Sequence, residues 1–423
     1  MPPDVLAAAS RHAAERSADD AKLVRQFFRN TAARSAALDQ LRTELAAVRK
    51  ERTDVDTAVA TTLIFKEMAT PKPSYILNRG EYDQHGAEVT RRTPTMLPPM
   101  DAAAPNNRLG LAQWLVSPAN PLPARVAVNR FWQQFFGVGL VKTTNDFGAQ
   151  GEAPSHPELL DWLAVDFMEH GWDVKRLVRE LVVSAAYRQT SHVSPELYKR
   201  DPENRLLARG ARFRLDAEML RDQALYSSGL LVEKMGGPSV KPPQPAGLWE
   251  AVGYSGSNTV KFVADEGHEK VHRRTLYTFI KRTAPPPEMN TFDAPSRESC
   301  IVRRERTNTP LQALLLLNDP QYVEAARSLA ERTMHEGGDS VEQRARFLFQ
   351  TATCRQPQVD ELSDLVAAYE QELEHFQANA GAAEELIASG SLKADEKLDR
   401  PELAAWTMAA NVVLNLDEVV TRN

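Results

Sequence analysis

The sequence predicts a mainly α-helical protein, in which a multi-helix globular domain with a small antiparallel β-hairpin follows a helical segment and an extended linker. Two observations carry this prediction. Apolar residues recur at helical spacing through most of the chain, and N-cap residues, prolines and glycines mark where the helices begin and end. We expect an N-terminal helical, coiled-coil-like segment at 1–68, a Pro-rich extended linker at 69–107 and a helical domain at 108–423.

The composition is that of an ordinary globular protein, with 42% hydrophobic and 26% charged residues among 423. A net charge of −6 argues against a broad basic surface, so we expect no nucleic-acid partner. No run of about eighteen apolar residues is present, so no membrane span is predicted. The first residues lack a basic stretch followed by an apolar one, and we therefore predict no export signal.

The N-terminal segment carries a regular apolar seam. Leu38, Leu41, Leu45 and Val48 alternate at spacings of three and four, which is the pattern of a coiled coil. Because short isolated coils are marginally stable, we favour packing of this seam inside a helical hairpin. Pairing with another helix in a coiled coil is the alternative. In the linker, residues 74–77 are expected to form an edge strand.

The start of the helical domain contains a candidate catalytic pair. Ser155 and Glu158 have the spacing of a capping box and predict a helix that begins there. His156 then lies in the first turn, on the buried side, close behind the loop that carries Asp146. A carboxylate that orients an imidazole makes it a general base near neutral pH. A structural histidine at a helix start is the alternative, and we favour it.

The stretch 273–332 carries the densest structural signals. Residues 275–280 are aromatic and β-branched, and we expect them to pair with residues 260–263 as an antiparallel hairpin. Thr309 and Gln312 predict a capping box around Pro310, followed by a buried helix at 311–317. Asp319 caps the next helix.

The loop before that helix is a candidate anion-binding site. Its cationic residues are Arg297, Arg303, Arg304 and Arg306. Guanidinium groups beside the free N–H groups of a helix start can bind carboxylate, sulfate or phosphate. The interleaved acidic residues are Asp293, Glu298 and Glu305. Because buried charges are normally paired, we favour internal salt bridges over ligand binding.

No cofactor is predicted for this chain. The histidines predict no metal site, and no phosphate-binding or dinucleotide-binding glycine motif follows a predicted strand. Cys300 and Cys354 lie outside any C-x-x-C-H pattern, which argues against haem attachment. We expect both cysteines to be free, buried thiols. The alternative is a single disulfide, if the protein is exported.

The motif TFDAPSRESCIVRRERTNTPLQALLLLNDPQYVEAAR resembles the planctomycete-type PSD-one domain family, a domain of unknown function numbered fifteen-fifty-three. Residues 108–189 and the ending AAWTMAANVVLNLDEVVTRN are similar to the same domain. The resemblance implies the C-terminal part of larger proteins that also carry an export signal, a c-type cytochrome region and another uncharacterised domain. It thereby implies an exported, envelope-associated protein linked to electron transfer or polysaccharide use, with haem c in an upstream domain or a partner protein.

These expectations lead to two functional hypotheses. The first is an uncharacterised, non-catalytic binding or scaffold module of an exported cytochrome-c-linked protein, with a c-type cytochrome as its partner. The alternative is a hydrolase, or another enzyme, that acts on carbohydrate or sulfated polysaccharide. In that case Asp146 and His156 would be catalytic, and the arginine loop would hold the anionic carbohydrate.

Overall fold

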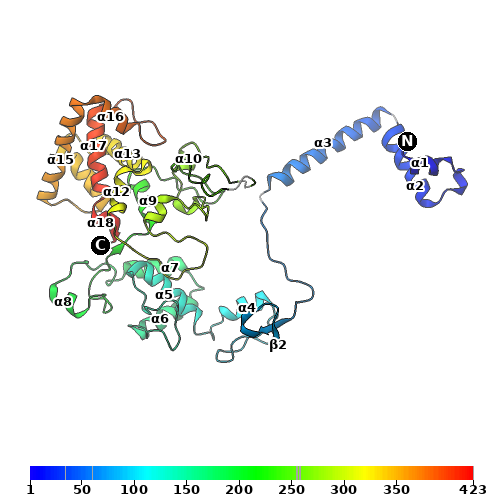
Figure 1. Cartoon of the computed structure of the whole chain (residues 1–423), viewed down its shortest axis with the longest axis horizontal. Helices are drawn as coiled ribbons and strands as arrows, with labels where there is room; N and C mark the ends of the chain where they lie inside the picture. Colours follow the sequence, from blue (N-terminus) through cyan, green and yellow to red (C-terminus); the bar gives the residue numbers. More distant parts are fainter. Residues whose placement is uncertain (34, 60, 254–255, 257–258, 423) are drawn as a thin grey trace. The chain divides into compact units, whose positions relative to one another are not determined.

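The computed structural model describes residues 1–33, 35–59, 61–253, 256 and 259–422. The protein is mainly α-helical with a small antiparallel hairpin, as predicted (Figure 1). The chain divides into two compact units, Met1–Arg92 and Thr93–Asn423. Among the described residues, no helix is both long and apolar enough to cross a membrane.

The first unit contains several helices and a two-stranded sheet. Its elements are α1 (Pro3–Ser10), η1 (Ala13–Glu15), α2 (Ala18–Phe27), η2 (Phe28–Ala32), α3 (Ala36–Ala58), β1 (Ser74–Leu77), η3 (Asn78–Gly80) and β2 (His85–Val89). Ser35 is the N-cap of α3, and its side chain accepts a hydrogen bond from the N–H of Leu38. It has no buried residue, so the predicted packing of its seam inside a helical hairpin is wrong.

The hairpin lies in the linker and not at the predicted place. The strand β1 forms where an edge strand was expected and pairs antiparallel with β2, with Tyr75 opposite Glu88. Residues 260–263 form no strand, and residues 275–277 form the 3₁₀ helix η4. The hairpin predicted for these two segments is therefore wrong. Asp222 accepts hydrogen bonds from both the N–H and the hydroxyl of Thr275, and these tertiary contacts hold the segment in another conformation.

The second unit is a helical domain. Its helices are α4 (Arg108–Leu115), α5 (Pro123–Phe136), α6 (Pro157–Glu169), α7 (Val174–Val183), α8 (Pro195–Arg200), α9 (Ala217–Ser227), α10 (His268–Val271), η4 (Thr275–Tyr277), α11 (Pro287–Thr291), α12 (Pro310–Asn318), α13 (Pro320–Glu336), α14 (Val341–Thr353), α15 (Val359–Ala378), α16 (Ala380–Ile387), α17 (Arg400–Leu414) and α18 (Asp417–Val420). The short strands β3 (Phe213–Arg214) and β4 (Thr421–Arg422) pair antiparallel and tie the end of the chain to its middle.

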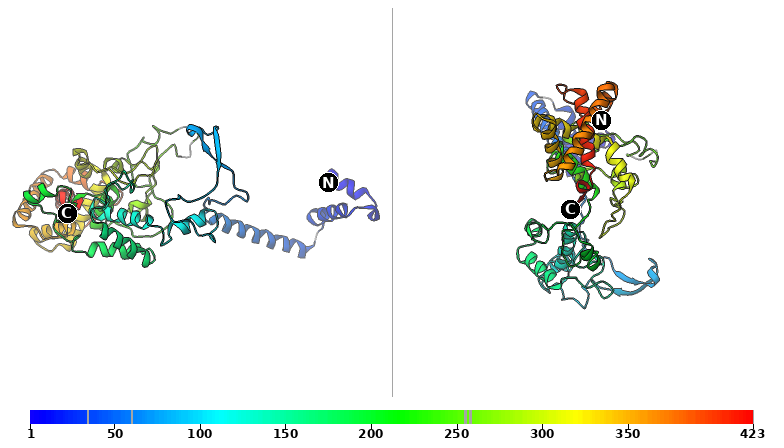
Figure 2. Two further views of the ribbon diagram at one scale, coloured as in Figure 1. Left: turned by 90° about the horizontal axis from the view of Figure 1, so that it is seen from below. Right: turned by 90° about the vertical axis from the view of Figure 1, so that its left-hand side faces the viewer.

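The largest apolar core surrounds α17. In every view this red helix lies among the yellow and orange helices α13 to α16 (Figures 1 and 2). Trp406 is fully buried there and stacks on Tyr369, with ring centroids 4.0 Å apart. A second core joins α5, α6 and α7, and includes the stacked rings of Trp132 and Phe136. A third core joins α9, α11, α12 and α13.

Two helix starts differ from the prediction. The helix α6 begins at Pro157 with His156 in the N-cap position, and Ser155 makes no cap hydrogen bond, so that capping box is wrong. At α12, Thr309 makes no cap bond either, and the Gln312 side chain donates to the carbonyl of Thr291, so the capping box predicted there is also wrong.

The exposure of α12 and of the cysteines also differs from the prediction. Leu311 and Leu314 are 60% and 56% exposed, while Leu316 is buried, so only one face of α12 is inside the protein. Cys300 and Cys354 are free, as expected, but both are exposed and not buried.

Candidate functional site

The arginine loop folds onto the start of α9. Arg304 donates two hydrogen bonds to the Glu218 carboxylate, at 2.5 and 3.0 Å, and the Nη2 atom of Arg297 lies 3.7 Å from the same carboxylate. Arg306 reaches Asp216, the buried N-cap residue of α9, with Nε and Oδ1 3.5 Å apart. Three of the four predicted arginines therefore converge on two carboxylates of one helix start.

Most of the acidic partners are not those predicted from the sequence. Arg303 does pair with Glu305, at 3.9 Å, and both side chains are exposed. Asp293 instead accepts two hydrogen bonds from Thr307, through its N–H and its hydroxyl. The carboxylates that pair with the loop lie in α9, about eighty to ninety residues earlier in the chain.

The electrostatics of this cluster favour the fully charged pair. Burial alone would raise the pKa of Glu218, but the hydrogen bonds from Arg304, a backbone hydrogen bond and the charges of Arg304 and Arg297 together outweigh burial and hold this pKa below its ordinary value. The same hydrogen bonds raise the pKa of Arg304. A bidentate pair of this kind uses the planar fork of the guanidinium, so Arg304 has little capacity left for an external anion.

The structure does not join Asp146 to His156. The Asp146 carboxylate accepts a hydrogen bond from the N–H of Gly148, while the His156 Nδ1 atom lies 3.0 Å from the hydroxyl of Ser155. Both side chains are half-buried. Within the described part of the chain, no hydrogen bond links the two residues, so their catalytic role stays a prediction.

A second polar cluster was missed by the sequence reasoning. His268 and His272 lie one turn apart, with their Nδ1 atoms 3.0 Å from each other. On the other side of the His272 ring, Nε2 lies 3.3 Å from a carboxylate oxygen of Glu324, and both residues are only 2% exposed. The run HEKVH at 268–272 has the H-E-x-x-H spacing, which was the signal that could have drawn attention to this segment.

The geometry of this cluster is that of three polar side chains in a row and not of a metal centre. Glu324 and His268 contact opposite ring nitrogens of His272, so the three side chains do not converge on one point. Over the described ranges, no group of three or more His, Cys, Asp or Glu side chains is arranged to hold a metal ion. Burial, followed by the neighbouring His272, lowers the pKa of His268.

A buried cluster of ionisable groups lies between α9, α11 and α13. The guanidinium of Arg221 is 3% exposed and donates to the carbonyls of Val271 and Arg273 and to the side chain of Gln321. Glu288 is also buried, at 6% exposure. Burial raises the pKa of Glu288 to about 7, against the opposing effect of Arg221. A carboxylate that is partly protonated near neutral pH is unusual and marks this cluster as sensitive to pH.

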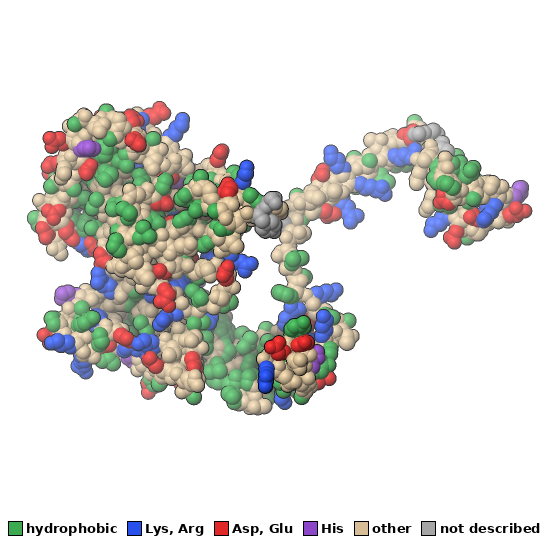
Figure 3. All heavy atoms as spheres, viewed as in Figure 1, with side chains coloured by type: hydrophobic (Ala, Val, Ile, Leu, Met, Phe, Trp, Pro, Cys, Tyr) green, Lys and Arg blue, Asp and Glu red, His purple; other side chains and the backbone are tan. Residues whose placement is uncertain are grey.

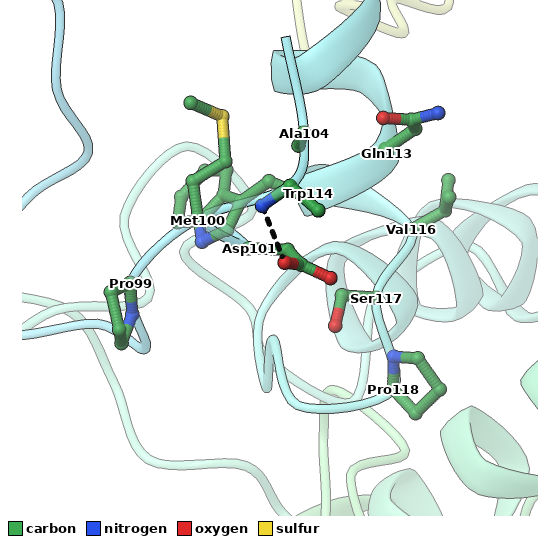
Figure 4. A pocket seen from close by; sticks show the side chains of 10 residues that line it. Pro99, Met100, Asp101, Ala104, Gln113, Trp114, Val116, Ser117 and Pro118 are labelled. Atoms are coloured by element: carbon green, nitrogen blue, oxygen red, sulfur yellow. Dashed lines mark hydrogen bonds between the residues drawn. The ribbon is translucent and has the colours of Figure 1, made fainter. Parts of the chain in front are cut away.

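A cavity of about 640 Å³ lies at the start of the domain, where α4 meets the Pro-rich stretch before it. Pro99 and Met100 line one side and Val116 and Pro118 the other (Figure 4). The Trp114 indole N–H donates to the carbonyl of Pro98, at 2.7 Å, and fixes this stretch to the helix.

The same region is close-packed at its base. Gly110 is buried, and a Cβ atom there would lie 1.9 Å from the carbonyl oxygen of Pro105. Only glycine therefore allows α4 to lie this close to the preceding chain.

The outer face of α4 is strongly apolar. Leu109 and Val116 are 59% and 53% exposed, Leu111 and Leu115 are 46% and 41% exposed, and Met96 on the neighbouring stretch is 88% exposed. Hydrophobic side chains gather around α4 in the space-filling view (Figure 3). Large exposed apolar patches mark places where other molecules bind. We call these five residues the α4 surface.

The second unit is mainly helical, most of its arginine-loop charges are paired, and α4 presents an apolar face to solvent. The profile of the PSD1 family, described as a protein of unknown function (DUF1553), matches residues 107–369. The chain belongs to this family. Comparisons with curated proteins and with solved structures find no match.

Proposed function

We propose that this protein is a non-catalytic binding or scaffold module that docks another protein domain on the α4 surface. The exposed leucines of α4 are the observation that carries the proposal. A helix of eight residues that buries only Gly110 and Trp114 and presents Leu109, Leu111 and Leu115 to solvent is typical of a protein-binding surface. The cavity beside it gives a partner side chain a place to anchor.

The charged residues support a structural role. Arg304 is paired with Glu218 through two hydrogen bonds, and Arg306 lies over the Phe213 ring at 4.3 Å and beside Asp216. An anion bound by this loop would have to displace the contacts that hold the loop to the start of α9. This arrangement favours a scaffold over an enzyme that holds a sulfated polysaccharide.

For the partner we propose a c-type cytochrome domain in an exported, envelope-associated assembly. This choice is supported by the resemblance of residues 108–189 and 291–327 to a domain that accompanies such cytochromes. Haem c would then be held by the partner and not by this chain.

A binding measurement tests the proposal. A c-type cytochrome domain from a PSD-one-family protein is titrated into the full chain and into the double variant Leu111→Lys/Leu115→Lys by calorimetry. Burying one leucine contributes about 1.5–3 kcal/mol, so we expect the variant to bind at least about 10-fold more weakly. Leu276→Lys is the matched control, because Leu276 is 77% exposed and lies outside α4.

Equal affinity of the double variant and the control would contradict the proposal, provided that circular dichroism shows both to be folded. Absence of any binding would contradict the choice of partner. Turnover of a sulfated polysaccharide that is lost in a folded His156→Ala variant would favour the hydrolase alternative instead.

A further inference from the structure

The helix α3 presents a largely apolar stripe to solvent. Its positions repeat at spacings of three and four over the whole helix and are Leu38, Leu41, Leu45, Val48, Arg52 and Val55. Leu41, Leu45 and Val48 are 60%, 51% and 61% exposed. Five of these six positions are apolar, and α3 has no buried residue to balance this exposure.

The charges beside the stripe define a register. In heptad terms Leu38 and Leu45 occupy a positions, Leu41 occupies a d position, Glu44 is a g residue and Arg49 is an e residue. When two copies of α3 run parallel and in register, Glu44 of each copy faces Arg49 of the other. These attractive pairs form twice because the arrangement is symmetric.

The opposite orientation brings like charges together. An antiparallel pair that matches all six layers places Leu38 against Val55 of the second copy. Glu44 then faces Glu51, and Arg42 faces Arg49, so both edges of the stripe are repulsive. The flanking charges therefore favour the parallel orientation.

We propose that α3 joins two copies of this chain in a parallel, two-stranded coiled coil. The single charged residue of the stripe favours a coiled coil of two helices over one of three or four. Arg52 is an a residue, and a long cation at that position can extend to solvent in a dimer but would be enclosed in a trimer or tetramer. The like-charge contact of Glu51 with Asp56 of the other copy also forms twice, and the contact of Asp56 with Arg52 in the same helix, at 3.5 Å, offsets part of this repulsion.

The mass of the full chain in solution tests the proposal. Sedimentation equilibrium from about 1 to 100 µM is expected to show a species of twice 47.1 kDa. The variant Leu41→Lys/Leu45→Lys is expected to be monomeric throughout this range. Ala47→Lys is the matched control, because Ala47 is exposed on the same helix but lies outside the stripe, and it should remain dimeric.

Charge exchange tests the orientation in the same experiment. Glu44→Arg should weaken the dimer, and the double variant Glu44→Arg/Arg49→Glu should restore it, because the parallel pair is re-formed with its charges reversed. A chain that is monomeric at 100 µM, a trimer or tetramer, or a dimer that persists in Leu41→Lys/Leu45→Lys would each overturn the proposal. A dimer that Glu44→Arg strengthens would overturn the parallel orientation.

Discussion

Glu288 makes the stability of this protein depend on pH in a way that one substitution should remove. Its carboxyl group is 6% exposed, and burial raises its pKa to about 7 from an ordinary value of 4.5. A backbone hydrogen bond lowers this pKa most, followed by Arg221 and the side chain of Gln321, whereas Asp319 adds to the rise. The buried site therefore prefers the protonated acid.

The sign and the size follow from linkage. Between pH 4.5 and 7 the folded protein binds more protons at Glu288 than the unfolded chain does, so its contribution to the free energy of unfolding falls as pH rises. One pKa unit corresponds to about 1.4 kcal/mol. The pKa difference of about 2.5 units sets the total loss of stability over the whole titration. Because part of that total is already lost at pH 5, the loss between pH 5 and pH 8 is about 2.5 kcal/mol.

Urea unfolding of the wild type and of Glu288→Gln at pH 5, 6, 7 and 8 measures this loss. Glutamine keeps the shape of the side chain but cannot ionise. The free energy of unfolding of the wild type, relative to the variant, should fall by about 2.5 kcal/mol across this range. The difference between the two free energies of unfolding removes the contributions of all other titrating groups, because both proteins share them. Parallel curves would refute the reasoning, because they would mean that Glu288 is ionised in the folded protein throughout the range.

Three further perturbations test the paired charges, the packing and the thiols. Arg304→Ala should lower the free energy of unfolding by about 1–3 kcal/mol, since it removes both side-chain hydrogen bonds to a mostly buried carboxylate, whereas Arg303→Ala should change it by less than about 0.5 kcal/mol in the same urea titration. Gly110→Ala should lower the melting temperature, since its Cβ would clash with a backbone carbonyl; an unchanged value in calorimetry would contradict the close approach. Cys300 and Cys354 should both react rapidly with a thiol reagent in the native protein, and protection of either would contradict its exposure.

Helix boundaries were the most predictable part of the fold, because they depend on neighbouring residues. Asp319 caps α13 as expected, Asp173 likewise caps α7, and Gly137 ends α5 with a positive φ of 78°. The caps predicted at Ser155 and Thr309 do not form. A tertiary contact competes for the same side chains or backbone; the N–H of Ser155, for example, donates to the carbonyl of Leu140.

The partners of charged side chains could not be predicted. The sequence places acidic residues next to the arginine loop, but Arg304 selects Glu218, 86 residues away, because the fold brings the start of α9 against the loop. The β-hairpin was misplaced for a similar reason. Apolar and β-branched residues at 275–280 favour a strand, and contacts from Arg221 and Asp222 override that preference.

The two proposed surfaces together lead to a prediction that neither makes alone. A dimer joined through α3 presents two copies of the α4 surface. When partner domains are immobilised close together and one copy has bound, the second copy meets a neighbouring partner domain at a high effective concentration. The variant Leu41→Lys/Leu45→Lys should therefore dissociate at least about 10-fold faster than the wild type from a densely immobilised c-type cytochrome domain, while its affinity for the free domain in solution stays unchanged. Surface plasmon resonance at high and low immobilisation density, together with calorimetry, separates the two effects. A loss of affinity in solution would show that α3 contacts the partner directly, and equal dissociation rates at high density would show that the two copies cannot bind at once.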